Sequence, residues 1–220
     1  MMDLNKYIEH TNLSPTITDR DIDQLVGEAL EYAFYAVCVP PFWVKKAKRE
    51  LGSADVKLVT VAGYPYGYNM AETKLEEIKK AMDDGADELD VMMNLSAFKS
   101  GMSWPKIEIS KFAQLIHQKE AIIKIIIETG YLDEKEIKSA CKVCKNGGAD
   151  FVVTSTDIGP EGANIKHLGL MKEVLSPQVG VKVSGGIESY EQSKVYLESG
   201  VDRIGTTFGL KIMNGLKIGS

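Results

Sequence analysis

The chain has 220 residues, of which 44% are hydrophobic, 8% aromatic and 26% charged, which is typical of a soluble globular protein and excludes a disordered or collagen-like chain. Its net charge of −5, without any basic stretch, argues against nucleic-acid binding. Apolar runs such as Ile125–Ile127 are far shorter than the roughly 20 residues of a membrane span. The start at Met1–Lys6 lacks the basic and apolar parts of a signal peptide, so we expect a cytoplasmic protein that does not enter a membrane.

Short apolar runs alternate with longer amphipathic stretches along the chain. The runs are rich in Val, Ile and Thr and almost continuously hydrophobic, as in parallel strands covered on both faces. We expect strands at Ile8–Leu13, Phe34–Val39, Lys57–Gly63, Glu88–Asn94, Ile122–Thr129, Phe151–Thr156, Gly180–Gly186 and Arg203–Thr207. The stretches between them predict helices that include Met70–Asp84, Trp104–Lys119, Glu134–Asn146, Ile165–Leu175 and Tyr190–Ser199.

A short repeat supports this alternation. Gly85-Ala-Asp87, Gly148-Ala-Asp150 and Gly200-Val-Asp202 each follow a predicted helix and lead into a strand, as expected of a glycine that ends a helix. Eight strands give roughly 27 residues per βα unit, the compact end for an eight-stranded barrel. An open doubly wound sheet is the alternative, but no G-x-G-x-x-G follows the first strong strand.

We therefore predict an α/β fold: one (β/α)8 TIM barrel domain over residues 1–220. Within it, residues 216–220 are expected to be a disordered tail or the remnant of an expression vector, because the chain ends in Gly-Ser.

The cysteines and histidines form no recognisable disulfide or metal pattern. Cys141-Lys-Val-Cys144 is a C-x-x-C, which in other settings serves redox or metal chemistry. Here it lies in a predicted helix with both sulfurs on one face, and neither a second C-x-x-C nor a nearby histidine accompanies it. We interpret the pair as buried thiols, and the three scattered histidines predict no metal site.

Ionisable residues inside predicted barrel strands need partners, because burying an unpaired charge costs several kcal/mol. Alternation places Lys182 opposite Val181 and Val183, and therefore in the lumen, where Asp90 is expected to pair with it. The same alternation places three residues of the fifth strand on one face: Lys124, Ile126 and Glu128. A purely stabilising salt bridge is the alternative, but barrel active sites lie at the carboxyl ends of the strands, so we predict that the pair serves chemistry.

Two glycine-rich turns follow the last strands, at Ser184–Ile187 and Gly205–Gly209. Turns at this place in a barrel often bind phosphate through backbone N–H groups, although short glycine turns are also common without a ligand. The expected substrate- or phosphate-binding residues are Thr156, Gly185, Gly186, Gly205, Thr206, Thr207 and Phe208.

Segments along nearly the whole chain resemble the deoxyribose-phosphate aldolase family. In order, they are Ile8-Glu-His-Thr11, Asp87–Asn94, Ile127-Glu-Thr-Gly130, Gly148–Phe151, Gly159-Pro160, Val181–Ile187 and Arg203–Thr206. The resemblance implies a (β/α)8 barrel and a class I aldol reaction with no metal or other cofactor. The family interconverts 2-deoxyribose 5-phosphate with glyceraldehyde 3-phosphate and acetaldehyde, so the implied partner is a small aldehyde or sugar phosphate, and the implied assembly is a homodimer.

The resemblance also assigns roles to two charged residues. Asp90 matches the aspartate that relays protons at the substrate carbonyl, and Lys182 matches the lysine whose charge lowers the pKa of the Schiff-base lysine. The Schiff-base lysine itself belongs to a Phe-Val-Lys-Thr-Ser-Thr-Gly motif. In this chain the run is Phe151-Val-Val-Thr-Ser-Thr-Asp157, so Val153 stands at the nucleophile's position and cannot form an imine.

Further departures fall in pocket segments rather than scaffold segments. Asp157 replaces a motif glycine and would repel a phosphate, and Phe208 stands where a small hydroxyl residue is usual. The other pocket segments that differ from the family pattern contain Asn12, Ser14, Tyr66 and Tyr68.

Three hypotheses follow. The first is an aldolase-family enzyme impaired by loss of the lysine. The second is a repurposed or engineered pocket, in which Lys182 forms the imine, or His10 or Asp157 acts as general base in a pocket lined by Tyr64, Tyr66 and Phe208. For His10 a structural hydrogen bond is the alternative. The third is a non-catalytic barrel that binds a small aldehyde or sugar.

Overall fold

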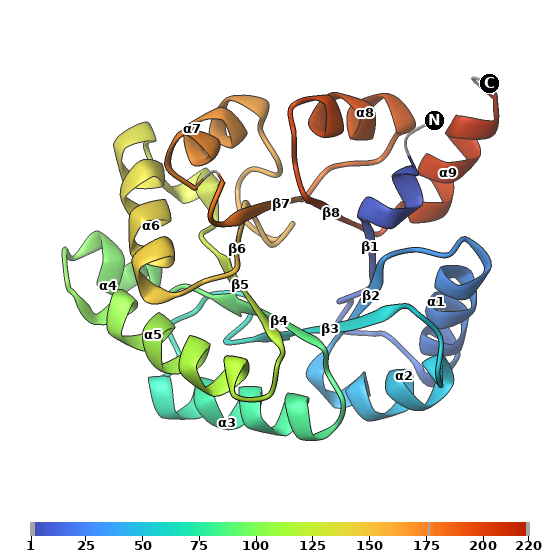
Figure 1. Cartoon of the computed structure of the whole chain (residues 1–220), viewed down its shortest axis with the longest axis horizontal. Helices are drawn as coiled ribbons and strands as arrows, with labels where there is room; N and C mark the ends of the chain where they lie inside the picture. The colour runs from blue at the N-terminus through green and yellow to red at the C-terminus, as the bar shows by residue number, and fades with distance from the viewer. Residues whose placement is uncertain (1–2, 176, 219–220) are drawn as a thin grey trace.

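The protein forms a closed barrel of eight parallel strands in a computed structural model that describes residues 3–175 and 177–218, with side chains as far as residue 216 (Figure 1). The strands are β1 (Ile8–Thr11), β2 (Ala36–Val39), β3 (Lys57–Ala62), β4 (Glu88–Met92), β5 (Ile122–Ile126), β6 (Phe151–Val153), β7 (Gly180–Ser184) and β8 (Arg203–Thr206). This confirms all eight predicted strands and the (β/α)8 barrel, and the doubly wound alternative is wrong. Most predicted strands extend too far at the carboxyl end, because the residues there leave the ladder to form the barrel mouth.

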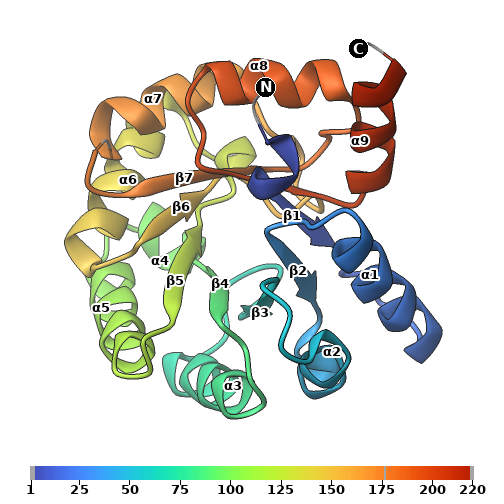
Figure 2. The same ribbon diagram turned by 45° about the vertical axis from the view of Figure 1, so that its right-hand side comes forward.

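Helices surround the barrel, as Figures 1 and 2 show. They are α1 (Asp19–Glu31), α2 (Val44–Leu51), α3 (Ala71–Asp83), α4 (Leu95–Lys99), α5 (Trp104–His117), α6 (Glu134–Gly147), α7 (Ile165–Leu175), α8 (Tyr190–Glu198) and α9 (Gly209–Ile218). The five predicted helices are present with nearly the predicted ends. Helix α9 extends to Ile218, so residues 216–218 are helical and not a disordered tail, whereas residues 219 and 220 lie outside the described residues.

The Gly-x-Asp repeat has one structural role in all three places. Each glycine has a left-handed φ, between 77° and 107°. A residue with a Cβ adopts such a φ only at an energetic cost. Each aspartate follows it and accepts a hydrogen bond from the backbone N–H of the preceding strand: Asp87 from Leu58 (2.8 Å), Asp150 from Ile123 (2.9 Å) and Asp202 from Val181 (2.8 Å). The repeat therefore ties the start of each even-numbered strand from β4 to β8 to its neighbour.

Side chains alternate between the lumen and the helix layer. Val181 and Val183 belong to the large core between strands and helices, so the predicted outward direction of both is confirmed. The lumen holds separate small apolar clusters, one of which contains Met92, Ile126 and Val153.

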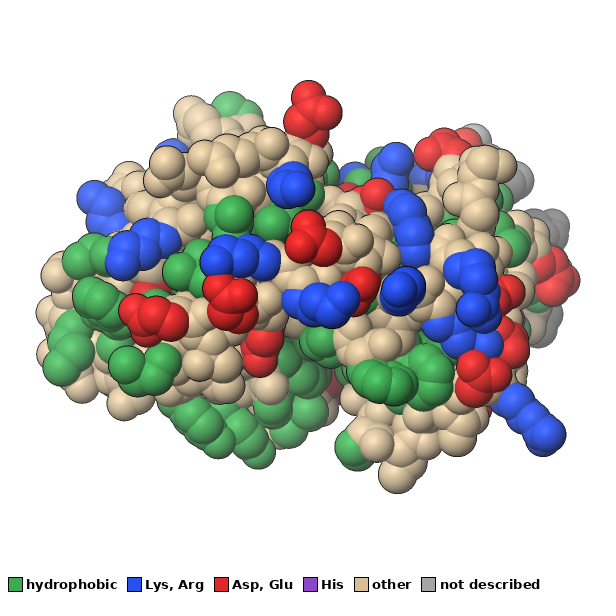
Figure 3. Space-filling view, turned by 90° about the horizontal axis from the view of Figure 1, so that it is seen from below, with side chains coloured by type: hydrophobic (Ala, Val, Ile, Leu, Met, Phe, Trp, Pro, Cys, Tyr) green, Lys and Arg blue, Asp and Glu red, His purple; other side chains and the backbone are tan. Residues whose placement is uncertain are grey.

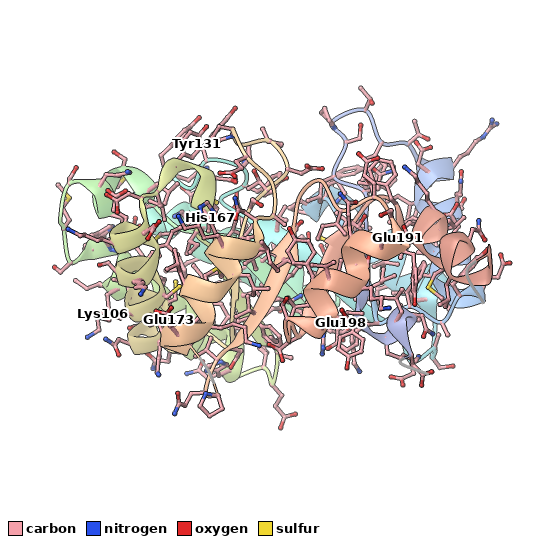
Figure 4. The ribbon with its side chains drawn as sticks, turned by 90° about the horizontal axis from the view of Figure 1, so that it is seen from above. Lys106, Tyr131, His167, Glu173, Glu191 and Glu198 are labelled. Atoms are coloured by element: carbon pink, nitrogen blue, oxygen red, sulfur yellow. The ribbon has the colours of Figure 1, made fainter. Side chains whose placement is uncertain are left out.

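The carboxyl ends of the strands lie at one end of the molecule. Figure 4 shows α6, α7 and α8 side by side on the barrel, with Tyr131, which follows β5, at that end and Glu198 toward the other. On the face drawn in Figure 3, acidic and basic side chains are interspersed, and hydrophobic side chains gather along one edge. Among the helices of residues 3–175 and 177–218, none is long and apolar enough to cross a membrane.

Candidate active site

A buried network of charges crosses the barrel lumen. The Glu9 carboxylate of β1 accepts from Lys124 Nζ of β5 (2.5 Å) and from Lys182 Nζ of β7. Lys182 also donates to Asp90 Oδ2 of β4 (2.6 Å), while Lys124 lies 2.6 Å from Glu88 Oε2. The predicted Asp90–Lys182 ion pair is thereby confirmed. All five side chains are at most 5% exposed, so each charge depends on its partners instead of water.

The electrostatics of this network favour charged lysines. Burial lowers the pKa of Lys182, but the carboxylates of Asp90 and Glu9 outweigh that effect and raise it above its ordinary value. For Lys124, too, burial is outweighed by neighbouring carboxylates, and its pKa is well above the ordinary value. Burial raises the pKa of Glu9, but both ammonium groups together lower it to about 2. The network therefore holds two ammonium groups rather than a free amine.

A cavity of about 300 Å³ opens above the network, at the carboxyl ends of the strands. Thr11 and Leu13 lie on its β1 side, and Tyr64 on its β3 side. The predicted site residues that line it are Asp90, Val153, Thr156, Asp157, Lys182, Gly185, Gly186, Gly205, Thr206, Thr207 and Phe208. The fold thus brings every one of these predicted residues to one place, whereas His10 and Tyr66 do not line this cavity.

Val153 lies at the end of β6, in register with Lys182 of β7. Its side chain is 1% exposed and packs in the lumen with Met92 and Ile126. Tyr64 contacts the same cluster and donates a hydrogen bond to the Thr156 carbonyl (2.7 Å). The wall of the cavity next to Lys182 is therefore apolar.

His10 does not face this cavity, which corrects its interpretation as a base there. Glu9 points into the lumen, so the next residue of β1 points toward the helices, where His10 Nε2 lies 2.7 Å from Glu28 Oε2. It borders a second cavity beside α1 and α9. Tyr66 does not line the central cavity either, because it is half exposed and stacks on Tyr68. The structural hydrogen bond considered for His10 is the interpretation that the structure supports.

The loop after β6 is hydrogen-bonded to Glu128, a residue for which no role was predicted. The Glu128 carboxylate is buried and accepts from both the backbone N–H and the hydroxyl of Thr156. Glu128 follows the end of β5 with a left-handed φ of 45°, so it lies outside the strand alternation that was used to predict its direction. Asp157 also has a left-handed φ, 69°, at the position where the family motif has glycine, a conformation that aspartate tolerates better than most residues.

Two other residues near the lysines, Glu9 and Cys38, were not predicted to belong to the site. Glu9 lies in the weakest predicted strand, and only its contacts with Lys124 and Lys182 reveal its importance. Cys38 of β2 lines the cavity, and burial raises its thiol pKa to about 12. The pairing of β1 with β2 and β8 fixes which of their side chains face the lumen, and this pairing is not visible in the sequence.

The Cys141–Cys144 pair lies on the inner side of α6, and both residues are fully buried and free. Burial raises the pKa of the Cys141 thiol to about 12 and that of Cys144 well above its ordinary value. The prediction of buried helix thiols is confirmed.

The fold and the cavity define a (β/α)8 barrel with an enzyme-type site at the carboxyl ends of its strands. The family model described as "DeoC/LacD family aldolase" matches residues 2–217. A deoxyribose-phosphate aldolase from Thermococcus gammatolerans is 47% identical over 98% of this chain and 97% of its own length, and one from Treponema denticola is 39% identical over 97% and 100%.

Solved structures agree with these sequence relatives. The aldolase QR15 superimposes with a TM-score of 0.93 at 38% identity, covering 99% of this chain and 97% of its own. A deoxyribose phosphate aldolase from Aeropyrum pernix, described as a tetramer, gives a TM-score of 0.91 at 31% identity, covering 97% and 91%. The chain belongs to the DeoC/LacD family of aldolases.

Proposed function

We propose that this chain has the binding cavity and the charged pair of a deoxyribose-phosphate aldolase but cannot perform the covalent step, so that its aldolase activity is impaired. The observation that carries the proposal is the apolar position of Val153, beside Lys182 and on the wall of the cavity. An imine needs a nitrogen nucleophile, and a valine side chain has none.

The roles within this proposal follow the family resemblance. Asp90 would hold and move a proton at the carbonyl group of a bound aldehyde, because its carboxylate lines the cavity. Lys182 would supply positive charge beside that group. Glu9 would act as a positioning residue, since it contacts Lys182 from the side away from the mouth and does not line the cavity.

Imine formation at Lys182 is the less favoured alternative. Its ammonium donates to Glu9 and Asp90, and its pKa is raised, so the free amine that attacks a carbonyl is scarce at neutral pH. A repurposed pocket with Asp157 as base remains a second alternative, since that carboxylate lines the cavity.

Borohydride trapping followed by intact-mass measurement tests the proposal, with acetaldehyde and with deoxyribose 5-phosphate as separate probes. We expect no adduct on the unmodified chain and a reduced adduct at residue 153 in Val153→Lys. Val153→Met is the matched control, because it has a long side chain without an amine.

An adduct on the unmodified chain that disappears in Lys182→Met would contradict the proposal and support chemistry at the second lysine. If Val153→Lys forms no adduct although its circular dichroism shows a folded barrel, the proposal that this cavity still binds these aldehydes is wrong.

We also infer, from the family resemblance, a cytoplasmic homodimer. Multi-angle light scattering measures the assembly, and a monomer mass at micromolar concentration would contradict the dimer.

A further inference from the structure

Tyr64 lies between the central cavity and a smaller side cavity. The side cavity has a volume of about 140 Å³, and its walls include Pro40 and Pro41 after β2 and Glu77 of α3. It shares three lining residues with the central cavity: Leu13, Val61 and Tyr64. Tyr64 has the largest side chain of the three, so its ring is the main barrier between the two cavities.

The ring of Tyr64 is held in place by packing and by a hydrogen bond. It contacts two apolar clusters of the lumen, one with Val153 and the other with Cys38. Its hydroxyl donates to the Thr156 carbonyl (2.7 Å), which joins the turn after β3 to the loop after β6. Thr156 in turn donates its backbone N–H and its hydroxyl to the buried Glu128. The ring therefore cannot turn aside without losing both a hydrogen bond and its packing.

The two sides of the central cavity suit different ends of a ligand. At the glycine turns, the backbone N–H groups of Gly186 and Thr207 donate no hydrogen bond within the described part of the chain, so they can serve a phosphate. In the closed barrel β3 lies opposite β7, and on the β3 side Val61 and the Tyr64 ring line the cavity. A ligand whose phosphate lies at the glycine turns thus has its apolar end directed toward Tyr64.

We propose that Tyr64 limits the length of the apolar end of a bound aldehyde and is thereby a specificity-determining residue. An aldehyde held beside Val153 has room for a short carbon chain before it meets the ring, and the side cavity behind the ring is closed to it. The glycine turns stay free for the phosphate of a sugar phosphate. This role of Tyr64 rests on the proposed function and deepens it, because it assigns the selection of short aldehydes to one side chain.

Imine trapping in Val153→Lys measures this selection, with acetaldehyde, butanal and hexanal as probes. The rate at which each adduct forms at residue 153 is divided by the rate of the same aldehyde with free lysine. We expect acetaldehyde to react at least about tenfold better than hexanal, because a pocket of fixed size rejects added methylenes by about that factor. When Tyr64→Ala is added to Val153→Lys, the two cavities join, and we expect the preference to fall at least about tenfold.

Two further variants of Val153→Lys show whether the ring is responsible. Tyr64→Phe keeps the ring and loses only the hydroxyl, so most of the preference for acetaldehyde should remain. Tyr66→Ala removes a half-exposed ring of the same loop that lines neither cavity, and it should leave the preference unchanged. A preference that survives Tyr64→Ala, or one that Tyr64→Phe abolishes as fully as Tyr64→Ala does, would overturn the assignment to the ring.

Binding of 1-hexanol tests the barrier without an imine. Titration followed by amide chemical shifts measures its Kd for the chain with Val153 unchanged, with and without Tyr64→Ala. We expect the Kd to be at least about tenfold lower in Tyr64→Ala, because the joined cavity buries the alkyl chain. Tyr64→Leu takes its place, with a change in the same direction, if circular dichroism shows that Tyr64→Ala does not fold. Equal Kd values with and without the ring would overturn the proposal.

The proposed function and the role of Tyr64 fail in different experiments. If Val153→Lys traps none of the three aldehydes but Tyr64→Ala binds 1-hexanol more tightly, the proposed function is wrong and the ring still limits the cavity. If Val153→Lys traps all three aldehydes equally well, the proposed function stands and Tyr64 does not select among them.

Discussion

Val153 and Lys182 lie in register on neighbouring strands, and both line the central cavity. Lys182 is fixed by Glu9 and Asp90 in its charged form. An amine at residue 153 would experience that charge as repulsion, which favours the neutral and nucleophilic form of the amine. In the proposed function, valine at this position leaves the charge of Lys182 without a neighbouring nucleophile to act on.

At the same scale, the three thiols should be inert in the folded protein. Cys38, Cys141 and Cys144 are at most 1% exposed, and burial raises the pKa of each, so the reactive thiolate is scarce. We expect no rapid reaction with Ellman's reagent in native buffer and three reactive thiols after unfolding in urea. Fast stoichiometric labelling of the native chain would show that Cys141 and Cys144 reach solvent, and would reopen a redox role for their C-x-x-C.

The elements of the barrel were predictable where their signal is local. The Gly-x-Asp repeat marks three helix ends, and in each case the strand that follows begins within one residue of the aspartate. The carboxyl ends were less predictable. For example, the run Ile122–Thr129 is apolar up to Ile127 apart from Lys124, but β5 stops at Ile126 and Glu128 takes a left-handed backbone conformation from which its side chain binds the next loop.

The repeat makes a testable contribution to stability at this scale. Asp202→Ala removes the acceptor of the Val181 N–H, and we expect the free energy of unfolding to fall by about 1–3 kcal/mol. Asp202→Asn keeps a carbonyl oxygen in place and should lose less than about 1 kcal/mol. Urea unfolding followed by circular dichroism measures both values. Equal losses in the two variants would show that charge, and not the hydrogen bond, is what Asp202 contributes.

For the whole molecule, closure of the barrel explains both what could be predicted and what could not. The Asp90–Lys182 pair was predictable because each residue is a charge inside a strong apolar strand. Glu9 and His10 were assigned poorly because β1 is a short, weak strand, and its inward face is fixed only when β1 pairs with both β2 and β8. That closure turns Glu9 into the lumen and His10 out of it, whereas sequence position alone had placed His10 at the mouth.

Glu9 connects three strands across the closed barrel, so its protonation should be felt by the whole fold. The pKa of Glu9 is lowered from 4.5 to about 2 in the folded chain, so its ionised form contributes stability that is fully present above pH 4.5 and is lost as the pH falls toward 2. Glu9→Gln leaves Lys124 and Lys182 each with one fewer charged partner, and we expect a loss of about 3–5 kcal/mol at pH 7.

Urea unfolding at pH 7, 5, 4 and 3 measures this effect. The difference in free energy of unfolding between the unmodified chain and Glu9→Gln should be constant down to about pH 5 and shrink below it. Below that pH, Glu9 of the unmodified chain becomes protonated and loses its charge, which the variant lacks at every pH. Glu191→Gln, an exposed change on α8, is the matched control and should stay within about 0.5 kcal/mol of the unmodified chain at pH 7. If this difference in free energy of unfolding stays the same from pH 7 to pH 3, the variant is destabilised by altered packing and not by loss of the charge of Glu9.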